Sequence, residues 1–386
     1  MQKYGSQIHR CFRCGYCKFP TDYSNFNCPS YRRFRFDSYS TGGRLWLIYA
    51  WLKGEIEWSE HFAEILYTCT TCKNCSEQCP MKFAPDIVDW IIEARGDMVE
   101  KGKIPPRVTR LFEAVYSYGN PFKQLRSDRA AWANGTKKYA PGDEYLLYVG
   151  CLGSYDENGQ KMARSLINVL ESARVSFGIL GNDEECCGNE IYLLGETGLF
   201  QNLVEKNTKK FKELGVTKIV TLSPHAYNTM KNNYPAFGGS FELYHYTQLL
   251  NDLIKKNKIK PSRAKVKVTF QDPCFLGRYN NIYDEPRHIL QSIPGIELIE
   301  MERNKRDAFC CGGGSGNFVT DFLAGGADSP ARIRTREAYE TGANTLAVAC
   351  PSCLTMLTDA VKAEDLDDKL AVKDISQILT ELLSAA

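Results

Sequence analysis

The chain has 386 residues, which is enough for two or three domains with sizeable cores. It carries 48 Lys and Arg against 46 Asp and Glu, and this near-neutral balance argues against a nucleic-acid-binding protein with a broad basic surface. A hydrophobic content of 43% and a charged content of 24% exclude disorder and collagen-like repeats, so the unusual feature is the 16 cysteines.

A disulfide framework would need an oxidising compartment and an export signal. The first ten residues, MQKYGSQIHR, contain no apolar signal region and no cleavage site. The strongly apolar stretch at residues 45–52 is too short to cross a bilayer. We therefore expect a reduced, cytoplasmic setting, no transmembrane segment and at most peripheral membrane association. Clustered cysteines in such a setting usually bind metal.

The first 104 residues hold eight cysteines in two groups. The second group has the spacing Cys-x2-Cys-x2-Cys-x3-Cys-Pro, which is typical of [4Fe–4S] clusters, whereas zinc sites use separated Cys-x2-Cys pairs. The first group has the same x2-x2 core, but its fourth cysteine follows after ten residues. The groups are Cys11, Cys14, Cys17 and Cys28, and Cys69, Cys72, Cys75 and Cys79.

In two-cluster ferredoxins the fourth cysteine of each group ligates the other cluster. The same exchange predicts two cubane [4Fe–4S] clusters in a ferredoxin-type domain at residues 1–104. Ligation within each group is the alternative. The exchanged sets are Cys11, Cys14, Cys17 and Cys79 for one cluster, and Cys28, Cys69, Cys72 and Cys75 for the other.

Helical patterns surround these cysteines, at residues 45–53 and 59–66 and as an amphipathic stripe at residues 87–94. Residues 105–144 are rich in Pro, Gly, Ser and Asn. We interpret them as a linker with a short helix at residues 108–115.

The remainder of the chain contains an internal repeat of about 120 residues. Cys151 lies 35 residues before Cys186-Cys187-Gly188, and Cys274 lies 36 residues before Cys310-Cys311-Gly312. Short apolar runs at residues 145–149, 218–222, 266–270 and 346–349 predict buried strands, and helical stretches at 162–173, 200–214 and 333–341 lie between them. We predict two α/β domains, at residues 145–262 and 263–386, with cysteines at the carboxyl ends of strands.

The pattern Cys…Cys-Cys-Gly…Cys-x2-Cys resembles the cysteine-rich CCG domain found in the B-type and D-type subunits of heterodisulfide reductase. It is also similar to iron–sulfur subunits of glycolate, lactate and glycerol-3-phosphate dehydrogenases. The resemblance covers nearly the whole chain, with a C-type ferredoxin module fused to a B-type module as in the D-type subunits. It implies a non-cubane [4Fe–4S] cluster in the second copy, which has the full set Cys274, Cys310, Cys311, Cys350 and Cys353.

The first copy departs from this pattern, because Ser223-Pro224-His225-Ala226 stands where the second copy has Cys350-Pro351-Ser352-Cys353. A five-thiolate cluster cannot form there. Cys151, Cys186 and Cys187 together with His225 could hold a smaller or cubane cluster, since imidazole can replace thiolate on iron. An empty site with His225 as an ordinary buried histidine is the alternative.

Several other residues near the second copy have simpler interpretations. Gly312, Gly313, Gly314 and Gly316 would let the backbone pass close to a cluster, and no Lys-Ser/Thr follows to make a phosphate loop. Arg278 and Arg287 are interpreted as solvated surface arginines. Steering of an anionic group is their alternative role.

Two functions follow from these sites. The first is electron transfer, in which the chain relays electrons within a larger redox complex of anaerobic metabolism. No dinucleotide fingerprint is present, so a flavin- or substrate-bearing partner would supply the electrons. The second is catalysis, in which the complete copy cleaves a disulfide, as the resemblance to heterodisulfide reductase implies. The two missing cysteines favour the relay.

Overall fold

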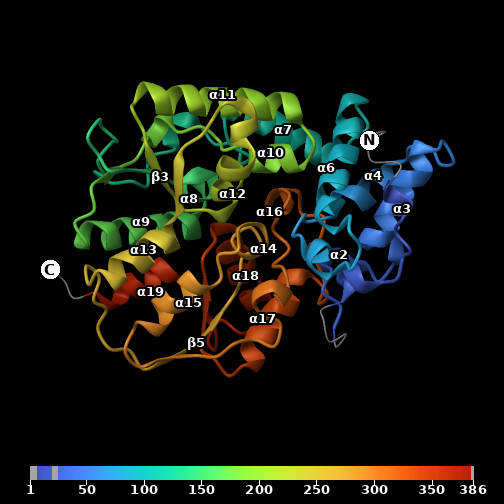
Figure 1. The fold of residues 1–386 in the computed structure, drawn as a ribbon. Helices are drawn as coiled ribbons and strands as arrows, with labels where there is room; N and C mark the ends of the chain where they lie inside the picture. The colour runs from blue at the N-terminus through green and yellow to red at the C-terminus, as the bar shows by residue number, and fades with distance from the viewer. Residues whose placement is uncertain (1–6, 20–24, 384–386) are drawn as a thin grey trace.

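The computed structural model describes residues 7–19 and 25–383 (Figure 1). A helical N-terminal region is followed by two α/β units, each built on a four-stranded parallel sheet. In Figure 1 the first unit, in green and yellow, lies above the second, in orange and red, and the blue N-terminal region lies at their right.

Short helices surround the two N-terminal cysteine groups, and all three helices predicted there are present. Ser40 and Ser59 cap α3 and α4, because each side-chain oxygen accepts a hydrogen bond from the backbone three residues later. The elements are η1 (Tyr16–Lys18), α2 (Pro29–Phe34), η2 (Asp37–Tyr39), α3 (Thr41–Leu52), α4 (Glu60–Tyr67), α5 (Asn74–Gln78), η3 (Ala84–Asp86) and α6 (Ile87–Glu100).

The helix expected at residues 108–115 is longer in the structure, where α7 spans Pro106–Tyr118. Pro106 occupies the first helical position, where its missing N–H costs nothing, and Gly119 ends the helix at φ +71°. Val108 and Leu111 on this helix are buried. A further 3-10 turn, η4 (Arg126–Asp128), precedes the first sheet.

The first sheet has the strand order β2-β1-β3-β4. The two predicted strands are its central pair, and the two strands that were not predicted lie at its edges. The elements are β1 (Tyr145–Tyr148), α8 (Gly150–Tyr155), α9 (Glu157–Ser172), β2 (Phe177–Gly178), η5 (Gly181–Asp183), α10 (Asn189–Leu193), α11 (Thr197–Glu213), β3 (Lys218–Thr221), α12 (Pro224–Asn232), η6 (Tyr234–Phe237), β4 (Glu242–His245) and α13 (Tyr246–Lys255).

The second sheet has the equivalent order β6-β5-β7-β8, again with the two predicted strands at its centre. The elements are β5 (Val266–Phe270), α14 (Gly277–Asn280), α15 (Asp284–Gln291), β6 (Ile296–Leu298), η7 (Lys305–Asp307), α16 (Asn317–Thr320), α17 (Pro330–Glu340), β7 (Thr345–Val348), α18 (Pro351–Ala363), β8 (Ala371–Asp374) and α19 (Ile375–Leu382). Both units are therefore copies of one fold.

The two units share a continuous apolar core. Helix α9 of the first packs on α18 and α19 of the second, while α13 of the first packs on α15. Tyr246 donates a hydrogen bond of 2.6 Å to the buried carboxylate of Asp374 across this junction. Because the shared surface is apolar and buried, we expect the two units to hold a fixed relative position.

Within the described residues, we find no helix with both the length and the apolar character needed to cross a membrane.

Candidate iron–sulfur sites

The N-terminal cysteines line two cavities, each with four thiols. Cys11, Cys14, Cys17 and Cys79 line the first, which we call site A. Cys28, Cys69, Cys72 and Cys75 line the second, site B. Each cavity therefore collects three cysteines from one sequence group and the fourth from the other group. Four converging thiols are the donor set that a four-iron cluster requires.

The two Cys-x2-Cys-x2-Cys loops have the same backbone geometry. Arg13 and Gly15 in the first loop, and Thr71 and Lys73 in the second, all have a positive φ. These positions correspond one to one in the two motifs. The repeated left-handed turns bend each loop around its cavity, and all three cysteines of each loop line that cavity.

Sites A and B are adjacent but differ in exposure. The side chain of Cys17 at site A interacts with Cys75 and Cys28 at site B. Cys14 at site A is exposed, whereas Cys28, Cys72 and Cys75 at site B are buried. Site A is therefore the N-terminal site nearer to solvent.

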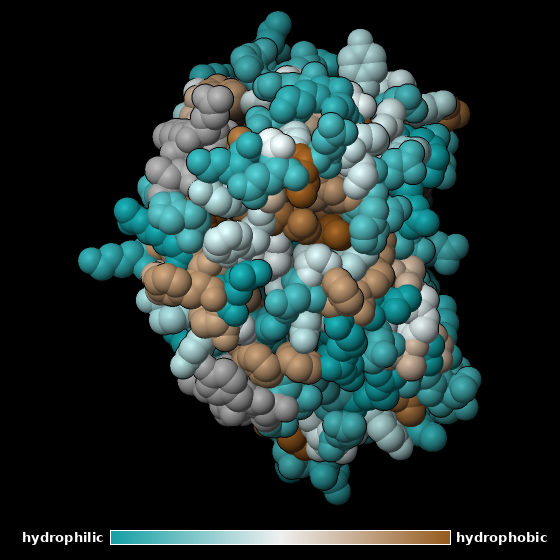
Figure 2. All heavy atoms as spheres, turned by 90° about the vertical axis from the view of Figure 1, so that its right-hand side faces the viewer, coloured by the Kyte–Doolittle hydropathy of each residue, from teal (hydrophilic) through white to brown (hydrophobic). Residues whose placement is uncertain are grey.

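Exposed aromatic side chains flank site A. Phe12 is 75% exposed and Tyr16 is 45% exposed, on either side of Cys14. Figure 2 views the molecule from the side on which the N-terminal region lies, and it shows a largely hydrophilic face with hydrophobic side chains gathered in a central hollow.

The complete cysteine set of the second α/β unit lies at the carboxyl ends of its strands. We call it site C: Cys274, Cys310, Cys311, Cys350 and Cys353. Cys274 follows β5, and Cys350 follows β7 and caps α18. The Sγ atoms of Cys353 and Cys311 are 3.4 Å apart, and the side chains of Cys274 and Cys310 interact. The parallel strands thus bring together residues separated by nearly 80 positions in the chain.

Site B lies directly against site C, because the side chains of Cys72 and Cys310 interact. That contact and burial raise the pKa of Cys72 well above its ordinary value. Around it, Arg278 donates from Nε to the Cys72 carbonyl at 2.8 Å, and Tyr279 donates to the Thr71 carbonyl at 2.6 Å. The sequence does not show this contact, since its partners lie in different domains.

The glycine-rich loop after Cys311 packs against the loop of site B. A Cβ on Gly314 would lie 2.5 Å from the carbonyl oxygen of Thr70, so only glycine fits there. The Thr71 and Ser315 hydroxyls are 3.3 Å apart across the same contact. The glycines thus bring the second unit onto the N-terminal region.

The interpretation of Arg278 and Arg287 as surface residues is wrong, because both are at most 8% exposed. Arg278 donates to the carbonyl oxygens of Cys72 and Ala308. Arg287 pairs with Asp272 at 2.7 Å, two residues before Cys274. The residues between Cys274 and Arg287 form short helices that face the protein interior, so carbonyls and carboxylates replace water around both guanidinium groups.

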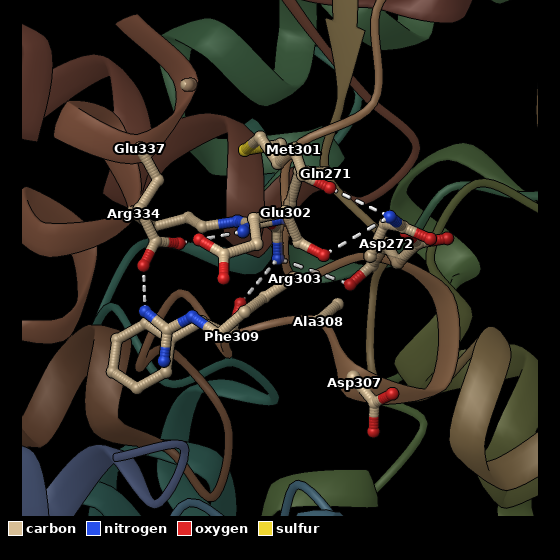
Figure 3. Close-up of polar contacts among 12 residues, drawn as sticks. Gln271, Asp272, Met301, Glu302, Arg303, Asp307, Ala308, Phe309, Arg334 and Glu337 are labelled. Carbon is tan, nitrogen blue, oxygen red and sulfur yellow. Dashed lines mark hydrogen bonds and ion pairs between the residues drawn. The ribbon is translucent and has the colours of Figure 1, made fainter. Parts of the chain in front are cut away.

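A second buried network supports the other side of site C (Figure 3). Arg334 donates to the side chains of Gln271 and Glu337, and Gln271 donates to the Phe309 carbonyl at 3.2 Å. Phe309 precedes Cys310 in the chain. The network therefore fixes the backbone on which the Cys310-Cys311 pair is carried.

Arg95 on α6 joins all three parts of the molecule and was not identified from the sequence. It is fully buried and donates to the Cys69 carbonyl, the Leu193 carbonyl and the Ser315 hydroxyl, each at 2.7 Å. The sequence indicates its burial in one way: Arg95 lies four residues after Ile91, on the apolar face of the predicted helix. A charged residue on such a face indicates a buried polar junction.

Replacing Arg95 by leucine is expected to lower the free energy of unfolding by about 3 kcal/mol, because several buried acceptors would lose their donor. Chemical denaturation monitored by circular dichroism measures this change. Arg110→Leu on α7 is the control, because Arg110 is exposed. Equal effects of the two substitutions would contradict the assignment of Arg95 as a junction.

The three cysteines of the first α/β unit also lie together, and we call them site D: Cys151, Cys186 and Cys187. They line a cavity of about 60 Å³ with Ser223, His225 and Ala226, and Ser352 of the second unit borders it. Arg129 lies 3.7 Å from the Cys151 sulfur and pairs with Glu184 at 2.7 Å. Apolar side chains of α7, including Leu111 and Val115, form another wall of this cavity.

His225 lies beside site D, but its contacts are with other groups. Its Nδ1 is 2.6 Å from the Glu190 carboxylate, and its side chain interacts electrostatically with Cys350 of site C. Burial disfavours the protonated imidazole, but Glu190 and Cys350 outweigh this effect and raise the pKa of His225 to about 10.

Comparison with protein families agrees with this architecture. The cysteine-rich CCG domain matches residues 145–231 and again 268–358, and the 4Fe-4S dicluster domain matches residues 7–83. The fold and its cysteine sites thus define a CCG-domain iron–sulfur protein.

The chain is 32% identical to the D-type subunit of the dihydromethanophenazine:CoB--CoM heterodisulfide reductase of Methanosarcina acetivorans, over 84% of this chain and 79% of that protein. It belongs to the family of iron–sulfur proteins that includes this relative. A probable iron–sulfur-binding oxidoreductase, FadF of Bacillus subtilis, is 40% identical over 84% of this chain and 47% of its own length.

The EtfAB:quinone oxidoreductase of Syntrophomonas wolfei is 37% identical over 82% of this chain and 46% of its own length. The chain therefore spans about half the length of these two bacterial relatives. A hypothetical protein from Helicobacter pylori has a similar fold, with a TM-score of 0.54 at 11% identity over 89% of this chain and 68% of that one.

Proposed function

We propose that this chain is the electron-transfer part of an iron–sulfur oxidoreductase complex. Sites A and B would each hold a cubane [4Fe–4S] cluster, and site C a non-cubane [4Fe–4S] cluster with the five cysteines of the second unit as ligands. Such clusters, when bound, accept and release single electrons. The protein supplies the thiols, the burial and the spacing between sites.

The contact between Cys72 and Cys310 carries this proposal. It brings a prospective ligand of site B into contact with one at site C, while the side chain of Cys17 at site A interacts with Cys75 and Cys28 at site B. The three sites therefore form an uninterrupted series from an exposed end to a buried one. A series of this kind suits one-electron relay.

The partner at the exposed end would be a flavin- or substrate-bearing protein. The names of two relatives are in keeping with this proposal, since one is an EtfAB:quinone oxidoreductase and another belongs to a heterodisulfide reductase. The near-neutral net charge fits a protein partner rather than nucleic acid, and the clustered thiols fit a reducing, cytoplasmic setting.

Iron and acid-labile sulfide analysis with redox-titrated EPR tests the proposal on anaerobically prepared protein. We expect about 12 irons per chain, that is, four for each of sites A, B and C. About 16 irons would show that site D also holds a cluster. About eight irons, with no third EPR signal, would contradict the assignment of site C.

Catalytic cleavage of a disulfide is the second candidate. The cavity between the two α/β units favours it, because Cys151, Cys187 and Ser352 border the same space close to site C. Turnover of a heterodisulfide with an artificial electron donor tests it. Robust turnover by the isolated protein would contradict a function limited to electron relay.

A further inference from the structure

The motif that lacks two cysteines occupies the same place in the first unit as the complete motif in the second. Ser223 lies two residues after the end of β3 and is the N-cap residue of α12, and Cys350 lies two residues after the end of β7 and is the N-cap residue of α18. His225 and Ser352 are therefore equivalent residues, two positions after each cap. Each of them lies toward the other unit.

His225 is fixed by contacts on three sides, and two of them come from the second unit. Its ring packs on Phe275 with the centroids 4.4 Å apart, and its side chain interacts electrostatically with Cys350. On the third side, Nδ1 is 2.6 Å from Glu190. Because Glu190 engages Nδ1, Nε2 is the nitrogen left for Cys350.

Glu190 is itself tied to the second unit. One carboxylate oxygen accepts from His225 and from Asn189 at 2.8 Å, and the other accepts from the backbone N–H of Gly316. Gly316 belongs to the glycine-rich loop after Cys311 and has φ +69°. Glu190 therefore holds the imidazole in place from both sides of the junction, as carboxylates do for metal-bound histidines.

We propose that His225, oriented by Glu190, is a positioning residue that donates a hydrogen bond to Cys350 and raises the reduction potential of the cluster at site C. The inference rests on the proposed occupancy of that site. A donor to a ligating sulfur withdraws negative charge from it and so favours the reduced cluster. The first unit thus acts on the cluster of its neighbour, and His225 is not a ligand at site D.

The test is redox-titrated EPR of the full chain with its clusters, comparing His225→Phe with His225→Gln. Phenylalanine keeps the ring but removes the donor, whereas glutamine retains an N–H. We expect the midpoint potential of site C to shift to more negative values in the Phe variant, with a smaller shift in the Gln variant. The midpoints of sites A and B and the iron content should stay unchanged.

Glu190→Gln provides an independent measurement, because it weakens the hold on the ring and leaves the histidine in place. We expect a negative shift smaller than that of His225→Phe. If His225→Phe does not fold, the site C midpoint of Glu190→Gln tests the inference in its place. His288→Gln is the matched control, since His288 is exposed on α15 of the second unit.

An unchanged midpoint at site C in the folded His225 and Glu190 variants would overturn the inference. Loss of about four irons with an unchanged site C midpoint would also overturn it, and would make His225 a ligand at site D. Absence of a site C signal in the unmodified protein would instead refute the proposed function. The two failures are therefore distinguishable.

Discussion

Replacing Cys311 by serine is expected to remove the cluster of site C and about four irons per chain, while the EPR signals of sites A and B remain. Cys311 is 5% exposed and lies 3.4 Å from Cys353 through their sulfur atoms, so its thiol is in the interior of the site. Serine keeps the volume but is a poor ligand to iron. Iron analysis and EPR of the purified variant measure the loss.

Cys311 gives a more specific test than Cys310, because the side chain of Cys310 also interacts with Cys72 of site B. The first unit offers a matched control in Cys187→Ser, which changes the equivalent cysteine of site D. We expect the site C signal to survive in that control. Loss of the signals of sites A and B in Cys311→Ser would contradict the separation of the sites.

The second large effect is expected for Cys28→Ser. Cys28 lines site B with the three cysteines of the other sequence group, so its loss should remove the cluster between sites A and C. About four irons should be lost, together with the magnetic interaction between site C and its neighbouring cluster. EPR of the fully reduced protein reports both changes, and reduction of site C through site A should stop.

Cys79→Ser is the matched comparison, since Cys79 lines site A. It should also remove about four irons, but the magnetic interaction between sites B and C should persist. The reverse outcome, with the interaction lost in Cys79→Ser and retained in Cys28→Ser, would show that each sequence group ligates its own cluster. The pair therefore tests the exchange of ligands directly.

The fold could largely be predicted from the sequence because its signals are local. The apolar runs at residues 145–149, 218–222, 266–270 and 346–349 became the central strands of the two sheets, since these strands are buried on both faces. The edge strands β2, β4, β6 and β8 were not recognised. Strands β2 and β6 have only two and three residues, and β4 and β8 have four residues of which only the last is buried, so none of them forms a continuous apolar run.

The buried arginines show where sequence reasoning failed. Arg278 stands in a segment with no strong apolar pattern, and nothing in its neighbours shows that the carbonyls of Cys72 and Ala308 would surround it. A guanidinium group is buried only when distant parts of the chain supply its acceptors. Those acceptors are set by tertiary packing, so the sequence could not distinguish this arginine from a solvated one.

The sequence by itself determined the chemistry of the sites, because ligand type and spacing along the chain identify iron–sulfur motifs and a duplicated CCG unit. Only the tertiary structure decided how the sites are related. It placed Cys72 against Cys310, and it brought His225 into contact with Glu190 and with Phe275 of the other unit. The physical reason is that contacts between domains depend on the packing of whole units, whereas motif spacing depends only on neighbouring residues.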